Sequence, residues 1–187
     1  MNTVKVDFDR DSWLYIPESW PWQGFADIDI WTETTARLLA EAYELDDDTA
    51  RWLSTSLRAI SRDRPAEESR FVYLADPGTF IFFVSVISAP SNRDVSIETL
   101  AGVDDPTATR PPEIEYLDSQ IGRGVRALRY ADIGEPSHDI AAIFQYAWRA
   151  DGLDIVVIAS NFNIPLLLEL QPTIDELALS ISVVDDE

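Results

Sequence analysis

Four carboxylates near the start of the chain have the spacing of a calcium-binding loop. Asp7, Asp9, Asp11 and Glu18 match positions 1, 3, 5 and 12 of an EF-hand loop. That loop also needs glycine at its sixth position, where this chain has Ser12, and a helix on each side. Only six residues precede the first aspartate, and they alternate in polarity as a strand does. The context favours carboxylates on the solvent face of a strand over a calcium site.

The single histidine restricts the catalytic chemistry open to the chain. His138 lies between Ser137 and Asp139, but residues adjacent in sequence do not converge into a catalytic triad. No strand-flanked G-x-S-x-G elbow supplies a nucleophile. There is no cysteine, which excludes thiol catalysis, thiolate zinc sites and iron–sulfur clusters. A hydrolase using His138 is therefore the least favoured function, and we expect no catalytic residue, no cofactor and no metal.

Three arginines form a dense basic cluster in the second half of the sequence. Arg123, Arg126 and Arg129 fall within one expected strand, where Arg126 would lie on one face and the other two on the opposite face. Pairing with nearby carboxylates is the favoured interpretation. The alternative is an anion or carboxylate-ligand site at the edge of the sheet, because guanidinium groups bind carboxylate and phosphate with two parallel hydrogen bonds.

An aromatic segment follows the second expected strand. Trp20, Trp22 and Phe25 are separated by Pro21 and Gly24, which indicates a loop. Exposed aromatic side chains of this kind anchor protein interfaces, so the three residues are a candidate interaction surface. The favoured interpretation is that the loop folds over the open end of a sheet and closes its core.

The charge balance excludes several kinds of partner. The chain has 187 residues, of which 34 are acidic and 14 basic, and its formal net charge is −20. Such a surface repels phosphates, so we expect no nucleic-acid binding and no membrane binding. No apolar leader follows Met1, and the longest mostly apolar run, residues 79–90, is far shorter than the ~20 residues of a membrane span. The expected location is the cytoplasm.

Hydrophobic periodicity and turn signals predict a single α+β domain over residues 1–187. Its core would be one antiparallel β-sheet meander, flanked by two N-terminal helices and a short C-terminal helix. A flexible loop is expected at 89–112, with a short element near 95–100. The first helix would bury a face with Trp31, Leu38 and Leu39, and Thr173 would cap the last helix. The expected strands are 4–8 paired with 13–16, then 69–75, 79–88, 113–118, 123–130, 140–150 and 153–160.

The order of these elements resembles the PsbP-like α/β sandwich. The residues that carry the resemblance are the segment 16–20 after the first strands, Gly122-Arg123-Gly124-Val125-Arg126 entering one strand, the Asp151-Gly152 hairpin and the closing segment 174–181. This superfamily includes the photosystem II extrinsic protein PsbP, a Ran-binding nuclear-import factor and LpqN-type lipoproteins. The resemblance implies a non-enzymatic binding or assembly module. A helix-grip fold is the rival architecture, although its last helix is normally long.

The first functional hypothesis is thus a non-catalytic binding module whose strongly acidic surface engages a protein partner. Complementary charge on a basic partner would speed association and make it sensitive to salt. The alternative is a carrier that holds a small apolar ligand between helices and sheet, lined by residues such as Phe80, Phe82 and Val84.

Overall fold

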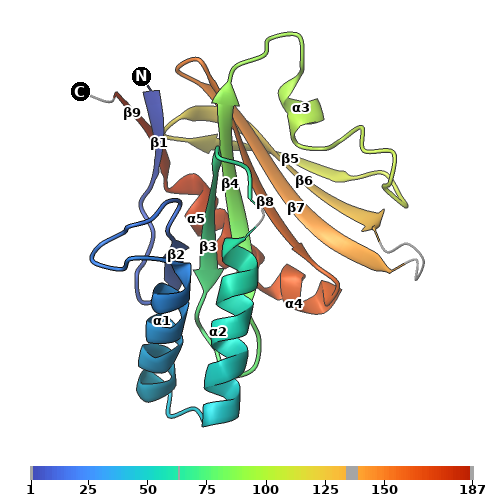
Figure 1. Ribbon diagram of the computed structural model, residues 1–187. Helices are drawn as coiled ribbons and strands as arrows, with labels where there is room; N and C mark the ends of the chain where they lie inside the picture. Colours follow the sequence, from blue (N-terminus) through green and yellow to red (C-terminus); the bar gives the residue numbers. More distant parts are fainter. Residues whose placement is uncertain (1, 63, 134–138, 186–187) are drawn as a thin grey trace. The chain divides into compact units, whose positions relative to one another are not determined.

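The computed structural model describes residues 2–62, 64–133 and 139–185 and shows an α+β protein (Figure 1). Its strands pair antiparallel, as predicted. The chain forms two compact units, one consisting of Asp9–Phe83 and the other of Met1–Phe8 with Val84–Glu187. The smaller unit is therefore an insertion within the sequence of the larger one. That residues 1–187 form one domain stays a prediction.

The smaller unit combines a strand pair with two helices. Strand β2 (Trp13–Ile16) pairs with β3 (Glu68–Tyr73), and helices α1 (Ile28–Ala42) and α2 (Asp47–Ser61) lie between them in sequence. Both helices begin after an aspartate whose side chain accepts a backbone N–H of the first turn, which satisfies a donor that has no partner within the helix. The buried core of this unit contains Ile16, Trp31, Leu57, Val72 and Leu74.

The buried face of α1 differs from the predicted one. Trp31 is buried as expected, but Thr32 and Ala36 are buried with it, and Leu38 is 52% exposed. The buried stripe is rotated toward the smaller side chains, which lets α2 pack closely against α1. The prediction, which counted apolar residues, placed the centre of the buried face too close to Leu38.

The larger unit contains a five-stranded antiparallel sheet in the order β4-β8-β7-β6-β5. Four of these strands form a meander, in which β7 and β8 turn at Asp151-Gly152 as predicted. Both turn residues have positive φ, 50° and 79°, as a type I′ hairpin requires. The bounds are β4 (Phe82–Pro90, in this unit from Val84), β5 (Glu113–Ser119), β6 (Gly122–Asp132), β7 (Ile140–Ala150) and β8 (Leu153–Asn161).

The two faces of this sheet are covered by different segments. Helices α4 (Ile164–Glu169) and α5 (Gln171–Leu179) follow β8, and α5 is hydrogen-bonded to the face that carries Tyr146. The short helix α3 (Ile97–Leu100) packs on the opposite face. Its segment joins a small core made of Ala101, Val125, Ala127 and Ala147.

The chain ends pair differently from the prediction. Strand β1 (Asn2–Val6) does not pair with β2; it pairs with a C-terminal strand, β9 (Ile181–Asp185), which periodicity did not indicate. The predicted C-terminal helix corresponds to α5, which begins at Gln171 rather than after a cap at Thr173, and it is preceded by a helix that was not predicted, α4. Pro172 fits the first turn of α5 because that turn needs no N–H donor.

The segment predicted as a flexible loop contains structure. Pro90 is the last residue of β4, and α3 lies within the expected short element. The backbone N–H of Ser91 donates to Gly152, and that of Thr109 donates to Tyr130, at 2.8 Å each. Flexibility of residues 89–112 stays a prediction. None of the helices in the described ranges has the length and apolar character needed to cross a membrane.

Candidate functional site

Arg126 belongs to a polar cluster between β6 and α5. Its Nη1 donates to both carboxylate oxygens of Asp175, at 2.7 and 2.5 Å, and its Nη2 pairs with Glu115 of β5. The hydroxyl of Tyr146 also donates to Asp175, at 2.6 Å. Burial, together with the hydrogen bond to Asp175, raises the pKa of Tyr146 above its ordinary value. The tyrosine is therefore a fixed donor rather than a proton-transfer group near neutral pH.

Arg129 fastens the segment that carries α3. The residue is only 8% exposed. Its Nε donates to Asp105 at 2.9 Å and its Nη1 donates to Gln145 at 2.7 Å, and Gln145 in turn donates to the carbonyl of Leu100 at 2.6 Å. Hydrogen bonds from Thr107, and then the Arg129 guanidinium, hold the pKa of Asp105 below its usual range. These hydrogen bonds position the backbone of the α3 segment on the sheet.

A second ion pair that holds the segment carrying α3 was not identified from the sequence. Arg149 and Asp154 lie directly opposite each other on β7 and β8, and Arg149 donates to both carboxylate oxygens at 2.6 and 3.1 Å. Arg149 also donates to the carbonyls of Asn92 and Val95, and Asp154 accepts the backbone N–H of Asn92. The signal was present, since opposite charges flank the Asp151-Gly152 turn at equal distance.

Arg123 lies apart from the other two arginines of the cluster. Its guanidinium carbon is 4.6 Å from the ring centroid of Tyr116, and the Tyr116 hydroxyl donates to Glu98 at 3.0 Å. Arg126 faces Asp175 and Arg129 faces Asp105. The structure thus pairs Arg126 and Arg129 with carboxylates, as the favoured interpretation expected, and does not bring the three guanidinium groups together.

The aromatic loop lies against the core of the smaller unit. Trp20, Trp22 and Phe25 are each half-buried and pack on the cluster that contains Ile16 and Trp31. The rings of Trp20 and Trp31 are 6.0 Å apart, and those of Trp22 and Phe25 are stacked at 6.5 Å. The loop thus covers part of the buried core of the smaller unit. Part of each ring is therefore covered by intramolecular packing, which leaves less aromatic surface for a partner.

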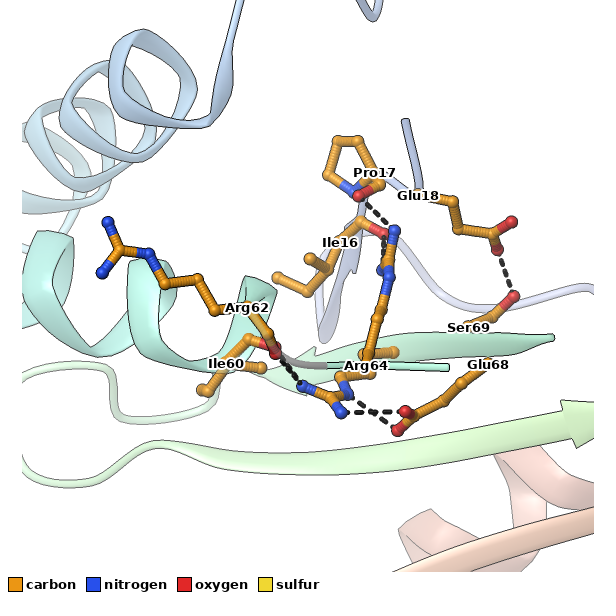
Figure 2. A network of polar contacts seen from close by, with 9 residues as sticks. Ile16, Pro17, Glu18, Ile60, Arg62, Arg64, Glu68 and Ser69 are labelled. Atoms are coloured by element: carbon orange, nitrogen blue, oxygen red, sulfur yellow. Dashed lines mark hydrogen bonds and ion pairs between the residues drawn. The ribbon is translucent and has the colours of Figure 1, made fainter. Parts of the chain in front are cut away.

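A polar network ties the C-terminal end of α2 to the strands of the smaller unit (Figure 2). Arg64 donates to the carbonyls of Ile16 and Pro17 at 3.1 and 2.6 Å, beyond the end of β2. Arg70 pairs with the buried carboxylate of Glu68 at 2.7 Å and donates to the carbonyl of Ile60. These arginines satisfy backbone carbonyls at a helix end and a strand end, so they serve the fold.

An open groove runs between α1 and α2. Its volume is about 590 Å³, and its small residues include Ala36, Ala40 and Ala50. Arg58 pairs across the helices with Asp29 at 2.7 Å and Glu33 at 3.5 Å. The remaining charged lining residues are Arg37, Glu41, Asp47 and Arg51. Charges of both signs over a floor of small side chains suit a polar protein segment better than an apolar molecule.

The described residues contain no group of three or more carboxylate or histidine side chains that could hold a metal ion. In the EF-hand-like segment, Asp9 instead accepts from Ser12 and from the backbone of Asp11, and Glu18 accepts from Tyr15 and Ser69. His138, the candidate base of the hydrolase hypothesis, lies outside the described residues.

No protein-family model matches this chain, and no curated protein matches it significantly. The functional argument therefore rests on the side-chain arrangement alone.

Proposed function

We propose that this protein is a non-catalytic binding module that engages a basic protein partner through its acidic surface. The observation that carries the proposal is that three arginines are paired with carboxylates inside the fold and do not offset the acidic residues elsewhere. The side chains of Arg70, Arg126 and Arg129 are only 12%, 13% and 10% exposed, because they are committed to internal carboxylates and carbonyls. Because each of these arginines is paired with a carboxylate, the pairs cancel, and the formal net charge of −20 is carried by the rest of the chain.

The alternative, a carrier of a small apolar ligand, has less support. Two of the residues expected to line its cavity, Phe82 and Val84, are 2% and 0% exposed. The groove on α1 and α2 has charged walls, whereas pockets for apolar ligands are lined mostly by apolar and aromatic side chains. A hydrolase using His138 has no support among the described residues.

We also propose the PsbP-like α/β sandwich as the architecture and the cytoplasm as the location. The element order supports the architecture, because a strand, two helices, an antiparallel meander and C-terminal helices follow one another as the resemblance implies. Helix α5 has nine residues, which disfavours the helix-grip alternative with its long last helix. A non-enzymatic assembly role would fit this architecture.

The test is capture of partners from the source organism's lysate at rising salt, using the full chain as bait. We expect a partner with a basic surface whose association rate falls at least about tenfold between 50 and 300 mM salt. The variant Glu33→Gln, Glu41→Gln, Asp47→Asn removes three exposed carboxylates and should weaken the same partner. The matched control Glu33→Asp, Glu41→Asp, Asp47→Glu keeps every charge and should not. Absence of any partner at every ionic strength, or binding insensitive to both salt and charge, would overturn the proposal.

A further inference from the structure

Strand β5 forms a free edge of the five-stranded sheet. Within the described residues, the strand order ends at β5, which has only β6 as a neighbour. The first four residues of β5 are exposed, whereas most of β6 is buried. An edge of this length presents a row of backbone donors and acceptors to which another strand can be added.

The register identifies the backbone groups that face outward. In an antiparallel ladder, successive residues direct their N–H and C=O groups to alternate sides. The carbonyl of Tyr130 accepts the N–H of Thr109, so the even-numbered residues of β6 face the β5 side. Their partners on β5 are odd-numbered, because Arg126 lies opposite Glu115. The remaining backbone groups, those of Ile114, Tyr116 and Asp118, are therefore directed to the free edge.

The side chains beside this edge alternate in chemistry. Ile114 and Tyr116 are 45% and 50% exposed on one face. The side chains of Glu113 and Glu115 are 66% and 57% exposed on the other face. Arg110 pairs with Glu113, Arg126 pairs with Glu115 and Asp175, and Arg123 lies over the Tyr116 ring. Both glutamates keep more than half of their side-chain surface exposed despite these pairs, so a basic side chain of an added strand can still reach them. An added strand would meet Ile114 and Tyr116, with Asp118 beyond them, on one side and the carboxylates of Glu113 and Glu115 on the other.

We propose that the β5 edge binds an extended peptide segment of the partner in which apolar and basic residues alternate. The added strand would hydrogen-bond to Ile114, Tyr116 and Asp118, place its apolar side chains beside Ile114 and Tyr116, and place its basic side chains beside Glu113 and Glu115. A second copy of this chain suits the edge less well, because each β5 brings three carboxylates to the shared ladder. The proposal rests on the acidic binding function and names the partner segment for it.

The test uses three capped, fluorescein-labelled seven-residue peptides and the full chain. One alternates lysine and valine, one has the same composition with all lysines before all valines, and one has glutamate in place of lysine. By fluorescence anisotropy we expect the alternating lysine peptide to bind at least about tenfold tighter than the other two. Its binding should slow amide exchange at Ile114, Tyr116 and Asp118.

The matched variants separate backbone pairing from side-chain contact. Tyr116→Pro removes an outward N–H without removing a bond to β6, so it should lower the affinity at least about tenfold and leave the far-UV spectrum unchanged. Tyr116→Ala keeps the backbone N–H and should lower the peptide affinity less than Tyr116→Pro does. If Tyr116→Pro does not fold, amide exchange in the unaltered chain decides.

Three outcomes would overturn the edge proposal. Equal binding of the alternating and the block lysine peptides would mean that charge alone acts, which leaves the acidic binding function intact. Failure of both lysine peptides to bind at low salt would count against that function as well. Protection of β5 without peptide, together with a dimer in sedimentation, would make a second copy the occupant.

Discussion

Replacing Gly124 by alanine should destabilise the fold through contact with one buried side chain. A Cβ on Gly124 would lie 2.3 Å from Nε1 of Trp148 and 2.5 Å from its Cδ1. Ordinary contacts begin at 3.4 Å, so the indole or the strand would have to move by about 1 Å in a close-packed interior. Trp148 has no exposed surface and is stacked on Tyr146, with ring planes 5° apart, so the indole has no open space to enter.

The sign of the effect distinguishes this contact from the ordinary consequence of the substitution. Where the backbone accepts alanine, Gly→Ala usually stabilises by about 0.4–1 kcal/mol, because it restricts the unfolded chain. Overpacking a core costs about 1–3 kcal/mol, and we expect a net loss of about 2 kcal/mol for Gly124→Ala. Gly78→Ala is the matched control and should be nearly neutral, since the close contact of its Cβ would be with the flexible end of Leu45, at 2.8 Å, and Asp76 would lie at an ordinary 3.8 Å.

Urea unfolding at pH 7, followed by far-UV circular dichroism, measures both variants. A double-mutant cycle identifies the cause: Trp148→Leu removes Nε1 and Cε2, and the indole N–H has no hydrogen-bond partner within the described structure. In that background Gly124→Ala should cost at least about 1 kcal/mol less than in the unaltered chain. Stabilisation by Gly124→Ala, or equal costs in both backgrounds, would refute the reasoning.

Two further predictions concern the ion pairs Arg129–Asp105 and Arg149–Asp154, which hold the α3 segment. Arg129→Met should lower the free energy of unfolding by about 3 kcal/mol, because it leaves Asp105 and Gln145 without their buried cation; a loss below about 1 kcal/mol in urea would contradict this. The hydrogen bonds from Arg149 hold the pKa of Asp154 below its usual range, so its stabilising effect is present above the unfolded pKa of about 3.9 and is lost as the pH falls through the folded value. Asp154→Asn should therefore flatten the loss of stability between about pH 5 and pH 2, and unchanged urea midpoints relative to the unaltered chain across that range would show that the carboxylate has no such role.

Elements with a local signal were predictable. The Asp151-Gly152 turn determines the register of β7 and β8, because a two-residue hairpin with positive φ leaves one pairing. The start of α2 follows from Asp46, whose side chain accepts the backbone N–H of Thr49. In both cases the residues that decide the structure lie within a few positions of one another.

Elements that depend on distant partners were not predictable. Five residues of β9 pair with β1 across almost the whole chain, and no short-range pattern encodes that pairing. Helix α4 was not predicted, because its apolar run, Leu166 to Leu168, is too short to show a helical period.

The candidate site was predictable to a similar degree. Residue type and strand position placed Arg126 on the face opposite Arg129, and the carboxylate excess implied that arginines would be paired. The partners Asp105 and Asp175 could not be named, since they come from a loop and a helix whose positions depend on packing. The sequence also did not show that β5 is an edge strand, because periodicity predicts a strand without showing which other strands lie beside it.

The pairing of β1 with β9 affects the order in which the chain can fold during synthesis. Val4 lies opposite Val183, so β1 emerges from the ribosome long before its partner strand is synthesised. The insertion Asp9–Phe83 has its own strand pair and core and can form in the interval. Contacts this distant in sequence slow folding, and β1 is exposed as an unpaired strand until β9 has emerged from the ribosome.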